Sequence, residues 1–144
     1  MKYLYYPGCS LEGSAREYDL STRSFLTAIG AKLVEIEDWT CCGASAAEAV
    51  SRNLALALPA RNLALAEKMG GTREILVPCS ACYLNLKAVE EKVKRDAALL
   101  DRINAILAVE GLRYAGRVRV RHLLEAVVRD IGPDLIAQKT VRSL

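Results

Sequence analysis

The sequence predicts an α/β fold with a mostly parallel sheet of about four strands and helices on its flanks. Short runs rich in β-branched and aromatic residues alternate with longer stretches that have helical patterns. Glycine or proline often marks the point where one kind of segment gives way to the other. Strands separated by helical stretches of this length connect by right-handed crossovers, which make neighbouring strands parallel.

Four short segments carry the strand pattern. Each is rich in branched or aromatic side chains, as expected of strands that are buried in a parallel sheet. Pro7 and Pro78 follow the first and the third segment, and proline cannot donate a hydrogen bond to a sheet ladder. The predicted strands are residues 2–6, 32–36, 73–77 and 118–120.

The predicted helices fill the segments between these strands. Two capping boxes indicate helix starts, the first formed by Ser14 and Glu17 and the second by Ser45 and Glu48. Asp96 is a predicted N-cap for a later helix. The predicted helices are residues 14–29, a long stretch from residue 45, residues 81–95, a segment from residue 96 that Gly111 ends, and residues 122–130.

The long stretch from residue 45 contains an internal repeat. Residues 52–57 and 61–66 have the same sequence, Arg-Asn-Leu-Ala-Leu-Ala. Because the offset between the copies is about two and a half helical turns, they do not share a helix face. We therefore interpret the repeat as two helical pieces that meet near Pro59, a residue suited to a first helical turn, and not as a binding repeat.

The composition is that of a globular domain and excludes several classes of function. The chain has 144 residues, of which 52% are apolar and 26% are charged. Its net charge of +3 comes from basic residues scattered among acids, which argues against nucleic-acid binding. No apolar run has the length of a membrane span, and the N-terminus lacks a signal-peptide layout. We therefore expect a single domain over residues 1–144, located in the cytoplasm.

Five cysteines follow the predicted strands. Cys9 follows the first strand, Cys41 and Cys42 follow the second, and Cys79 and Cys82 follow the third. The carboxyl ends of parallel strands lie at one edge of the sheet, where open α/β folds place their ligands. Cytoplasmic cysteines are metal ligands or reactive thiols more often than structural disulfides. The sequence therefore predicts a Rossmann-like fold with a metal site at this edge.

The residues around the cysteines favour thiolates. Cys42, Cys79 and Cys82 precede or enter predicted helices, whose N-terminal partial charge stabilises a thiolate. Gly8 and Gly43 allow the backbone to approach a cofactor closely. Structural zinc and a cubane iron–sulfur cluster each take four ligands, so either would leave a fifth cysteine as a reactive thiol or a neighbouring group. Alternatively, the two adjacent cysteines bind different irons of one unusual cluster.

Two further residues are candidates for a role near this site. His122 is the only histidine and lies at a predicted strand–helix junction. Imidazoles transfer protons near neutral pH, but a structural role is the favoured interpretation. Trp39 precedes the cysteine pair, and we expect it to shield the site from water.

This arrangement resembles the CCG cysteine-rich domain of the heterodisulfide reductase B-subunit family. The resemblance extends from residue 1 to about residue 130. Related modules occur in the iron–sulfur subunits of glycolate oxidase and lactate-utilisation systems. The residues that carry the resemblance are Tyr6-Pro7-Gly8-Cys9, Cys41-Cys42-Gly43, Pro78-Cys79, Cys82 and residues 120–125.

The resemblance implies an iron–sulfur oxidoreductase that reduces disulfides. In this family, substrate sulfur binds a noncubane 4Fe-4S cluster, and electrons arrive from a ferredoxin-like iron–sulfur subunit in complexes that also contain a flavin subunit. The implied ligands are Cys9, Cys41, Cys42, Cys79 and Cys82. One alternative is an electron relay in a 2-hydroxy-acid (glycolate or lactate) dehydrogenase-type complex. Another is a structural module that binds zinc.

The copy number of the module differs from the family pattern. Family members carry two copies of the module, whereas this chain carries one. We therefore expect a second CCG half or a homodimer as the partner of this chain, and a thiol or disulfide as its substrate.

Overall fold

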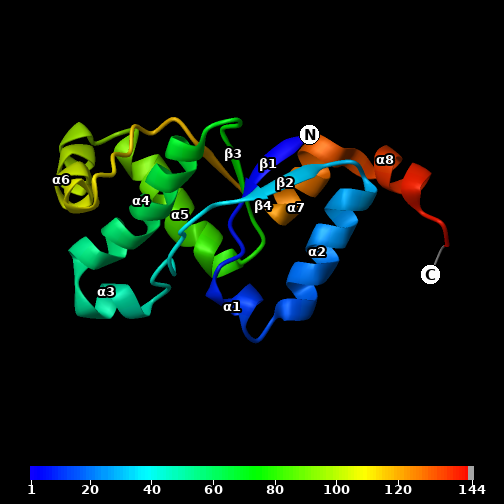
Figure 1. Cartoon of the computed structure of the whole chain (residues 1–144), viewed down its shortest axis with the longest axis horizontal. Helices are drawn as coiled ribbons and strands as arrows, with labels where there is room; N and C mark the ends of the chain where they lie inside the picture. Colours follow the sequence, from blue (N-terminus) through cyan, green and yellow to red (C-terminus); the bar gives the residue numbers. More distant parts are fainter. Residues whose placement is uncertain (143–144) are drawn as a thin grey trace.

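The computed structural model describes residues 1–142, in which four parallel strands lie between two groups of helices (Figure 1). The order of the strands in the sheet is β2-β1-β3-β4, and every neighbouring pair is parallel. The strands are β1 (Lys2–Tyr5), β2 (Lys32–Glu35), β3 (Glu74–Val77) and β4 (Arg119–His122). The predicted α/β fold with a parallel sheet is confirmed, with small shifts at the strand ends.

The two faces of the sheet are covered by different helices. Successive residues of β1 point to opposite faces, so Tyr3 and Tyr5 belong to one core and Leu4 belongs to the other. The core that contains Leu4 is completed by α4 (Arg52–Met69), α5 (Ser80–Val93) and α6 (Ala97–Leu107). The core on the other face is completed by α2 (Arg16–Ala28), α7 (Leu123–Ala126), the π-helical turn η2 (Val127–Ile131) and α8 (Gly132–Lys139).

Three short helical segments lie at the ends of the longer elements. They are α1 (Cys9–Glu12), α3 (Ala46–Val50) and the 3-10 turn η1 (Ala108–Glu110). Of these, α1 begins at the first cysteine itself, and the sequence pattern does not predict it. No helix in the described part of the chain is long and apolar enough to cross a membrane.

Two predicted helix caps are wrong. The N-cap of α2 is Ala15, whose side chain cannot accept a hydrogen bond, and Ser14 lies in the turn between α1 and α2. Ser45 does precede α3, but its backbone is already helical and its side chain makes no capping bond. The Asp96 cap is confirmed, because its Oδ1 accepts a hydrogen bond from the Leu99 N–H at 2.9 Å.

The helical stretch from residue 45 is interrupted at Ser51 and not at Pro59, so the predicted junction near Pro59 is wrong. Ser51 has extended backbone angles and caps α4 by accepting a hydrogen bond from the Leu54 N–H at 3.4 Å. The helix α4 then continues through Pro59 to Met69. An interior proline costs a helix about 3 kcal/mol. Burial of Pro59, Ala60 and the turns that follow them against the sheet offsets that cost.

The last predicted helix is also built differently. His122 belongs to β4, which extends beyond the predicted residues 118–120. The predicted helix over residues 122–130 is the short helix α7 followed by the π-helical turn η2. Beyond it, α8 begins at Gly132, with a proline in its first turn, and the sequence pattern does not predict this helix.

A buried carboxylate fastens the edge strand β4 to α5. Glu90 is almost fully buried, and its Oε2 accepts a hydrogen bond from the Val120 N–H at 2.8 Å. Lys94 donates to Oε1 at 2.6 Å, and Lys87 donates to Oε2 at 3.0 Å. Because both oxygens are paired, the buried charge is compensated. This contact fixes α5, which contains Cys82 and is preceded by Cys79, against the sheet.

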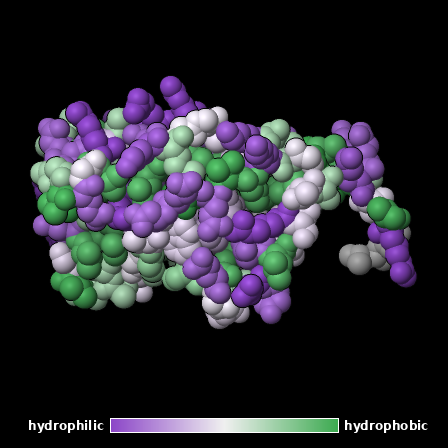
Figure 2. Space-filling model, viewed as in Figure 1, coloured by the Kyte–Doolittle hydropathy of each residue, from purple (hydrophilic) through white to green (hydrophobic). Residues whose placement is uncertain are grey.

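The surface mixes polar and apolar residues, with one apolar area on the face shown in Figure 2. Apolar side chains gather at the lower left of that view, over α3 and the start of α4. Val50 of α3 is 79% exposed, and Leu54 of α4 is also exposed. Exposed apolar residues that gather in one area are typical of a contact surface for another protein.

Candidate functional site

The five cysteines lie where the chain leaves the carboxyl ends of the strands. Cys9 begins α1 after β1, and Cys41 and Cys42 lie in the loop that follows β2. Cys79 is the N-cap of α5, and Cys82 lies in its first turn. All five thiols are free. Their exposure differs, since Cys42 and Cys82 are buried, Cys79 is half-buried, and Cys9 and Cys41 are exposed.

Two pairs of sulfur atoms are in contact. The Sγ atoms of Cys9 and Cys41 are 3.6 Å apart, and those of Cys42 and Cys82 are 3.4 Å apart. These are contacts between unbonded sulfurs, since a disulfide bond is about 2.0 Å long. Each pair joins residues that follow different strands. The parallel topology therefore brings thiols that are distant in sequence within reach of one another.

The Cys42–Cys82 contact favours a thiolate at Cys42. The hydrogen bond that these two sulfurs share lowers the pKa of Cys42 to about 6, although burial opposes this. The Ala44 N–H at 3.4 Å and the Asn85 amide at 3.7 Å also donate to the Cys42 sulfur. The same shared hydrogen bond raises the pKa of Cys82, which retains the proton of the pair. The pair therefore places one thiolate in a buried position.

Cys79 is also stabilised as a thiolate, whereas Cys9 is not. Burial opposes ionisation of Cys79, but the Ser10 hydroxyl at 3.5 Å and backbone N–H groups at the start of α5 lower its pKa. Contact with the Cys41 sulfur raises the pKa of Cys9. Sequence reasoning did not identify Ser10 or Asn85, because a single serine or asparagine has no spacing signature that marks it as a neighbour of a thiol.

Two glycines allow backbone and sulfur to approach closely. Gly8 has φ 79° and ψ 160°, a conformation that essentially only glycine adopts. A Cβ atom at Gly8 would lie 2.7 Å from the Cys82 Sγ. Gly43 has φ +85°, and a Cβ atom there would lie 2.6 Å from the Ala47 Cβ. The Gly43 N–H donates to the Cys41 sulfur at 3.4 Å. Both positions therefore require glycine.

An open cavity of about 530 Å³ adjoins the exposed cysteine pair. Trp39 lines this cavity together with Cys9 and Cys41. The Trp39 indole N–H donates to the Glu35 carboxylate at 3.1 Å, and its ring packs edge-on against Tyr6 at 5.2 Å between centroids. Much of the remaining lining is acidic. It comprises Glu12, Glu35, Glu37 and Asp38, with Ile36 and Thr40.

His122 has a capping role near the site. Its Nδ1 accepts a hydrogen bond from the Leu124 N–H at 3.2 Å, which caps α7. Its Nε2 lies 3.4 Å from the hydroxyl of Ser80, the residue after Cys79. The imidazole also packs edge-on against Tyr83, with 5.4 Å between ring centroids. This histidine therefore stabilises the connection between β4 and α7.

The chemistry of the donor set fits an iron–sulfur cluster. Within residues 1–142, no three His, Cys, Asp or Glu side chains are arranged to hold a single metal ion. Thiolate sulfur is the ligand that iron–sulfur clusters use, and all five thiols are free. The N–H groups of Gly43 and Ala44 already donate to two of the sulfurs.

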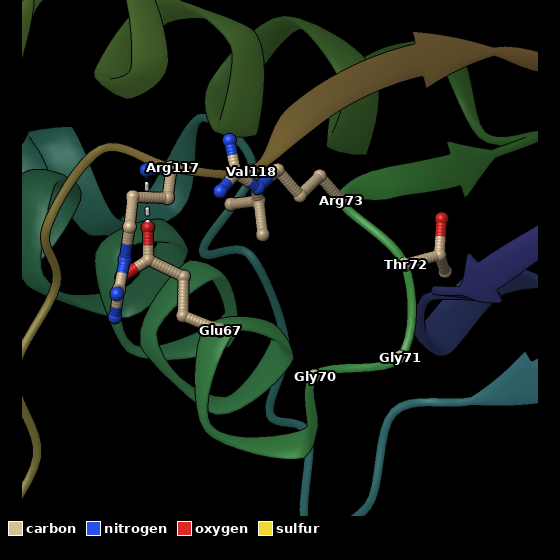
Figure 3. A pocket seen from close by; sticks show the side chains of 7 residues that line it. All are labelled: Glu67, Gly70, Gly71, Thr72, Arg73, Arg117 and Val118. Atoms are coloured by element: carbon tan, nitrogen blue, oxygen red, sulfur yellow. Dashed lines mark hydrogen bonds and ion pairs between the residues drawn. The ribbon is translucent and has the colours of Figure 1, made fainter.

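A second cavity, of about 460 Å³, lies at the opposite edge of the sheet (Figure 3). It is formed by the segments that lead into β3 and β4. Its carboxylate, Glu67, accepts hydrogen bonds from the backbone N–H groups of Ala115, at 2.7 Å, and Arg117. Glu67 therefore holds the loop before β4 and belongs to the fold. The cavity is lined by Glu67, Gly70, Gly71, Thr72, Arg73, Arg117 and Val118.

Proteins with similar sequences are reductase subunits. The chain is 38% identical, over 90% of its length, to the 8-methylmenaquinol:fumarate reductase membrane anchor subunit of Wolinella succinogenes. It is 29% identical, over 96% of its length, to a protein of Archaeoglobus profundus described as similar to the B subunit of heterodisulfide reductase. These matches cover 44% and 46% of the two relatives, so the chain spans about half the length of the curated relatives that it matches.

One further relative and one solved structure are also similar to this chain. The chain is 29% identical, over 88% of its length and 42% of the relative, to the B subunit of a ferredoxin/F420H2-dependent CoB-CoM heterodisulfide reductase from Methanosarcina acetivorans. The crystal structure of a hypothetical protein from Helicobacter pylori has a similar fold. Its TM-score is 0.74 at 21% sequence identity, over 88% of this chain and 25% of that one.

The family model of the CCG cysteine-rich domain matches residues 3–87. The matched span begins in β1, ends within α5 and contains all five cysteines. The resemblance to the B subunits of heterodisulfide reductases is confirmed by the relatives from Archaeoglobus and Methanosarcina. The chain belongs to the CCG cysteine-rich domain family.

Proposed function

We propose that the chain is an iron–sulfur redox module in which all five cysteines hold a noncubane 4Fe-4S cluster. The observation that carries this proposal is the convergence of five free thiols at the carboxyl edge of the sheet, with two pairs of sulfurs in contact. When bound, the cluster supplies one-electron redox chemistry and iron that accepts sulfur as a ligand. The proposed ligands are Cys9, Cys41, Cys42, Cys79 and Cys82.

The environments of the cysteines give the proposed site an inner and an outer side. Cys42 and Cys82 are buried and form the inner side, where N–H donors stabilise negative charge on sulfur. Cys9 and Cys41 are exposed and line the open cavity. A substrate or an electron-transfer partner would therefore approach from the side of Cys9 and Cys41. Trp39 lines this cavity, and we propose that its ring limits the access of water to the cluster.

The proposed reaction is the reduction of a disulfide within a heterodisulfide reductase-like complex. Cleaving a disulfide to two thiols consumes two electrons and two protons. The named relatives support this reaction, and one of them is described as ferredoxin-dependent. We propose that electrons reach this chain from a ferredoxin-like iron–sulfur subunit and a flavin-containing subunit. We propose a cytoplasmic location, because free thiols persist in a reducing compartment.

We also propose that this chain acts together with a second CCG domain. Because the chain spans about half of its curated relatives, we propose that it acts as one CCG domain and that a second CCG half completes the functional unit. A second copy of this chain, in a homodimer, would serve the same purpose. The exposed apolar residues of α3 and α4 offer a contact surface for such a partner.

An electron relay is the second candidate function. The relative that is 38% identical is named as a subunit of a menaquinol:fumarate reductase, and neither of those substrates is a disulfide. In such a role, as in 2-hydroxy-acid dehydrogenase-type complexes, electrons pass through the site without contact between substrate and cluster. The two functions thus differ in whether a substrate sulfur reaches the cysteines.

Anaerobically purified protein is expected to be brown and to contain about four irons per chain, with a matching amount of acid-labile sulfide. The reason is the set of five free thiols at one edge of the sheet. Iron, zinc and sulfide analysis of the same sample measures this directly. A result of one zinc per chain without labile sulfide would contradict the proposal and establish the structural zinc module.

Thiols are expected to change the EPR signal of the oxidised protein if the site reduces disulfides. Substrate sulfur would enter the cavity beside Cys9 and Cys41 and alter the surroundings of the cluster. The measurement compares spectra before and after the addition of neutral, cationic and anionic thiols and disulfides. If the chain is only an electron relay, the EPR signal is expected to stay unchanged. If the whole panel leaves the signal unchanged after the partner half has been restored, the relay function replaces the reductase.

A further inference from the structure

Asn62 binds the backbone of the residue that precedes the cysteine pair. It lies within α4 and is fully buried. Its Oδ1 accepts a hydrogen bond from the Thr40 N–H at 2.9 Å, and its Nδ2 donates to the Thr40 carbonyl at 2.8 Å. One side-chain amide therefore satisfies both backbone groups of Thr40, as a neighbouring strand would. Cys41 and Cys42 follow directly.

Further hydrogen bonds connect Asn62 and Thr40 to Leu58 in α4 and to Tyr6 after β1. The Asn62 amide also donates to the Leu58 carbonyl one turn earlier at 3.2 Å, which fixes the orientation of the side chain. The Tyr6 hydroxyl donates to the same Thr40 carbonyl at 2.7 Å. Tyr6 directly follows β1, in the segment that leads to Cys9. The hydrogen bonds around Thr40 therefore connect the two strand ends that carry the exposed cysteine pair.

Arg61 binds the same loop at Asp38, two residues before Thr40. Its guanidinium donates to the Asp38 carbonyl at 2.6 Å and to the Asp38 carboxylate at 2.7 Å. Asp38 has φ +56°, a left-handed conformation that is uncommon for residues other than glycine. Two consecutive residues of α4 thus bind two residues of the loop after β2. Because Arg61 and Asn62 belong to the part of α4 that packs in the core, they provide a rigid reference for that loop.

We propose that Asn62 is a positioning residue for Cys41 and Cys42, because its amide sets where the loop after β2 places these two thiols. The significance of this role for a cluster rests on the proposed function, whereas the positioning itself is a property of the metal-free chain. Without the amide, the Thr40 N–H loses its partner, and the Thr40 carbonyl keeps only the Tyr6 hydroxyl. The loop then moves toward solvent to satisfy the Thr40 N–H, and Cys42 loses its protected position.

The internal repeat supplies a matched control. Asn53 occupies the same place in the first copy of Arg-Asn-Leu-Ala-Leu-Ala and lies in the same helix, α4. Its side chain is exposed and accepts a hydrogen bond from Arg102 at 3.3 Å, far in sequence from the cysteine loop. A substitution at Asn53 therefore changes the same residue type in the same local sequence without touching Thr40.

The experiment measures the alkylation of each cysteine in the metal-free full chain by iodoacetamide and mass spectrometry. Asn62→Asp keeps the size and one acceptor of the side chain but replaces the Nδ2 donor with an oxygen that is repelled by the Thr40 and Leu58 carbonyls. Asn62→Ala removes both groups. In both variants, the rate at Cys42 relative to Cys79 is expected to rise about tenfold, as loss of buried hydrogen bonds predicts. Asn53→Asp is expected to leave this ratio unchanged. After reconstitution, Asn62→Asp is expected to show an altered EPR spectrum.

Three results would overturn the positioning role. The first is an unchanged ratio of Cys42 to Cys79 alkylation in both Asn62 variants. The second is an equal rise at both cysteines, which indicates general opening of the fold. The third is loss of the far-UV circular dichroism spectrum in both variants, which makes Asn62 a residue of core stability. If the wild-type protein takes up no cluster, the proposed function fails, and the alkylation ratios still decide the role of Asn62.

Discussion

Serine in place of Cys41 or Cys42 is expected to remove iron from the protein as completely as serine in place of Cys79. In a noncubane cluster with five cysteine ligands, every thiolate completes the coordination of iron, and a serine hydroxyl is a poor substitute for thiolate sulfur. Iron and acid-labile sulfide are expected to fall from about four per chain to background in each of these variants. Elemental analysis and the visible spectrum of anaerobically prepared samples provide the measurement.

Because Cys41 is exposed, its replacement distinguishes loss of iron ligation from loss of folding. Its side chain contributes little to the core, so the metal-free Cys41→Ser protein should have the circular dichroism spectrum and thermal midpoint of the wild-type metal-free chain. Loss of iron in this variant therefore reports on ligation and not on folding. If Cys41→Ser retains the iron content and spectrum of the wild type, a cubane with four thiolates is preferred. Cys41 would then be a free redox thiol.

Alanine at Gly8 is expected to prevent cluster binding although no ligand is changed. The new Cβ would lie 2.7 Å from the Cys82 Sγ, so this sulfur must move. The backbone of Gly8 is also in a region that alanine avoids, which adds about 1–3 kcal/mol of strain. We expect iron content below about a tenth of the wild-type value after anaerobic reconstitution, because ligand geometry is strict in iron–sulfur sites.

Gly30 offers the matched control for this substitution. It has φ +82°, close to that of Gly8, but a Cβ atom there meets no other atom within 4 Å. Gly30→Ala is therefore expected to lower the free energy of unfolding by about 1 kcal/mol, from backbone strain alone, and to keep its iron. Denaturant unfolding and iron analysis of both variants separate the two effects. Wild-type iron content in Gly8→Ala would show that the Gly8–Cys82 contact does not matter for binding.

The strands and the fold class could be predicted from the sequence because their signals are local and repeated. Each of β1, β2 and β3 contains adjacent apolar residues and is followed by a cysteine-bearing segment, whereas β4 is Arg-Val-Arg-His. A parallel sheet is buried on both faces, so its inner strands are rich in apolar residues and differ from the helices in pattern. The same pattern predicts that the thiols gather at one edge, since parallel strands all end there.

The helix boundaries could not be predicted to the same extent, because several residues compete for each of them. Ser45 and Ser51 are both suitable N-caps, and the chain uses the side chain of Ser51 alone. Pro59 has a strong local preference to begin a helix, yet the packing of α4 on the sheet outweighs it. The burial of Glu90 is also decided by the tertiary structure, since its sequence neighbours Glu91 and Lys92 are charged as well but are less buried.

The cysteine pattern and the succession of strands along the chain were determined by the sequence itself, because cysteines and β-branched runs are visible without knowledge of the fold. What surrounds the thiols was decided only by the tertiary structure. The two copies of Arg-Asn-Leu-Ala-Leu-Ala are identical in sequence and lie in one helix, yet Asn53 is exposed and Asn62 is fully buried against Thr40. Burial depends on which helix face meets the sheet, and an offset of two and a half turns places the copies on different faces. No local signal distinguishes the asparagine that holds the cysteine loop from the one that faces solvent.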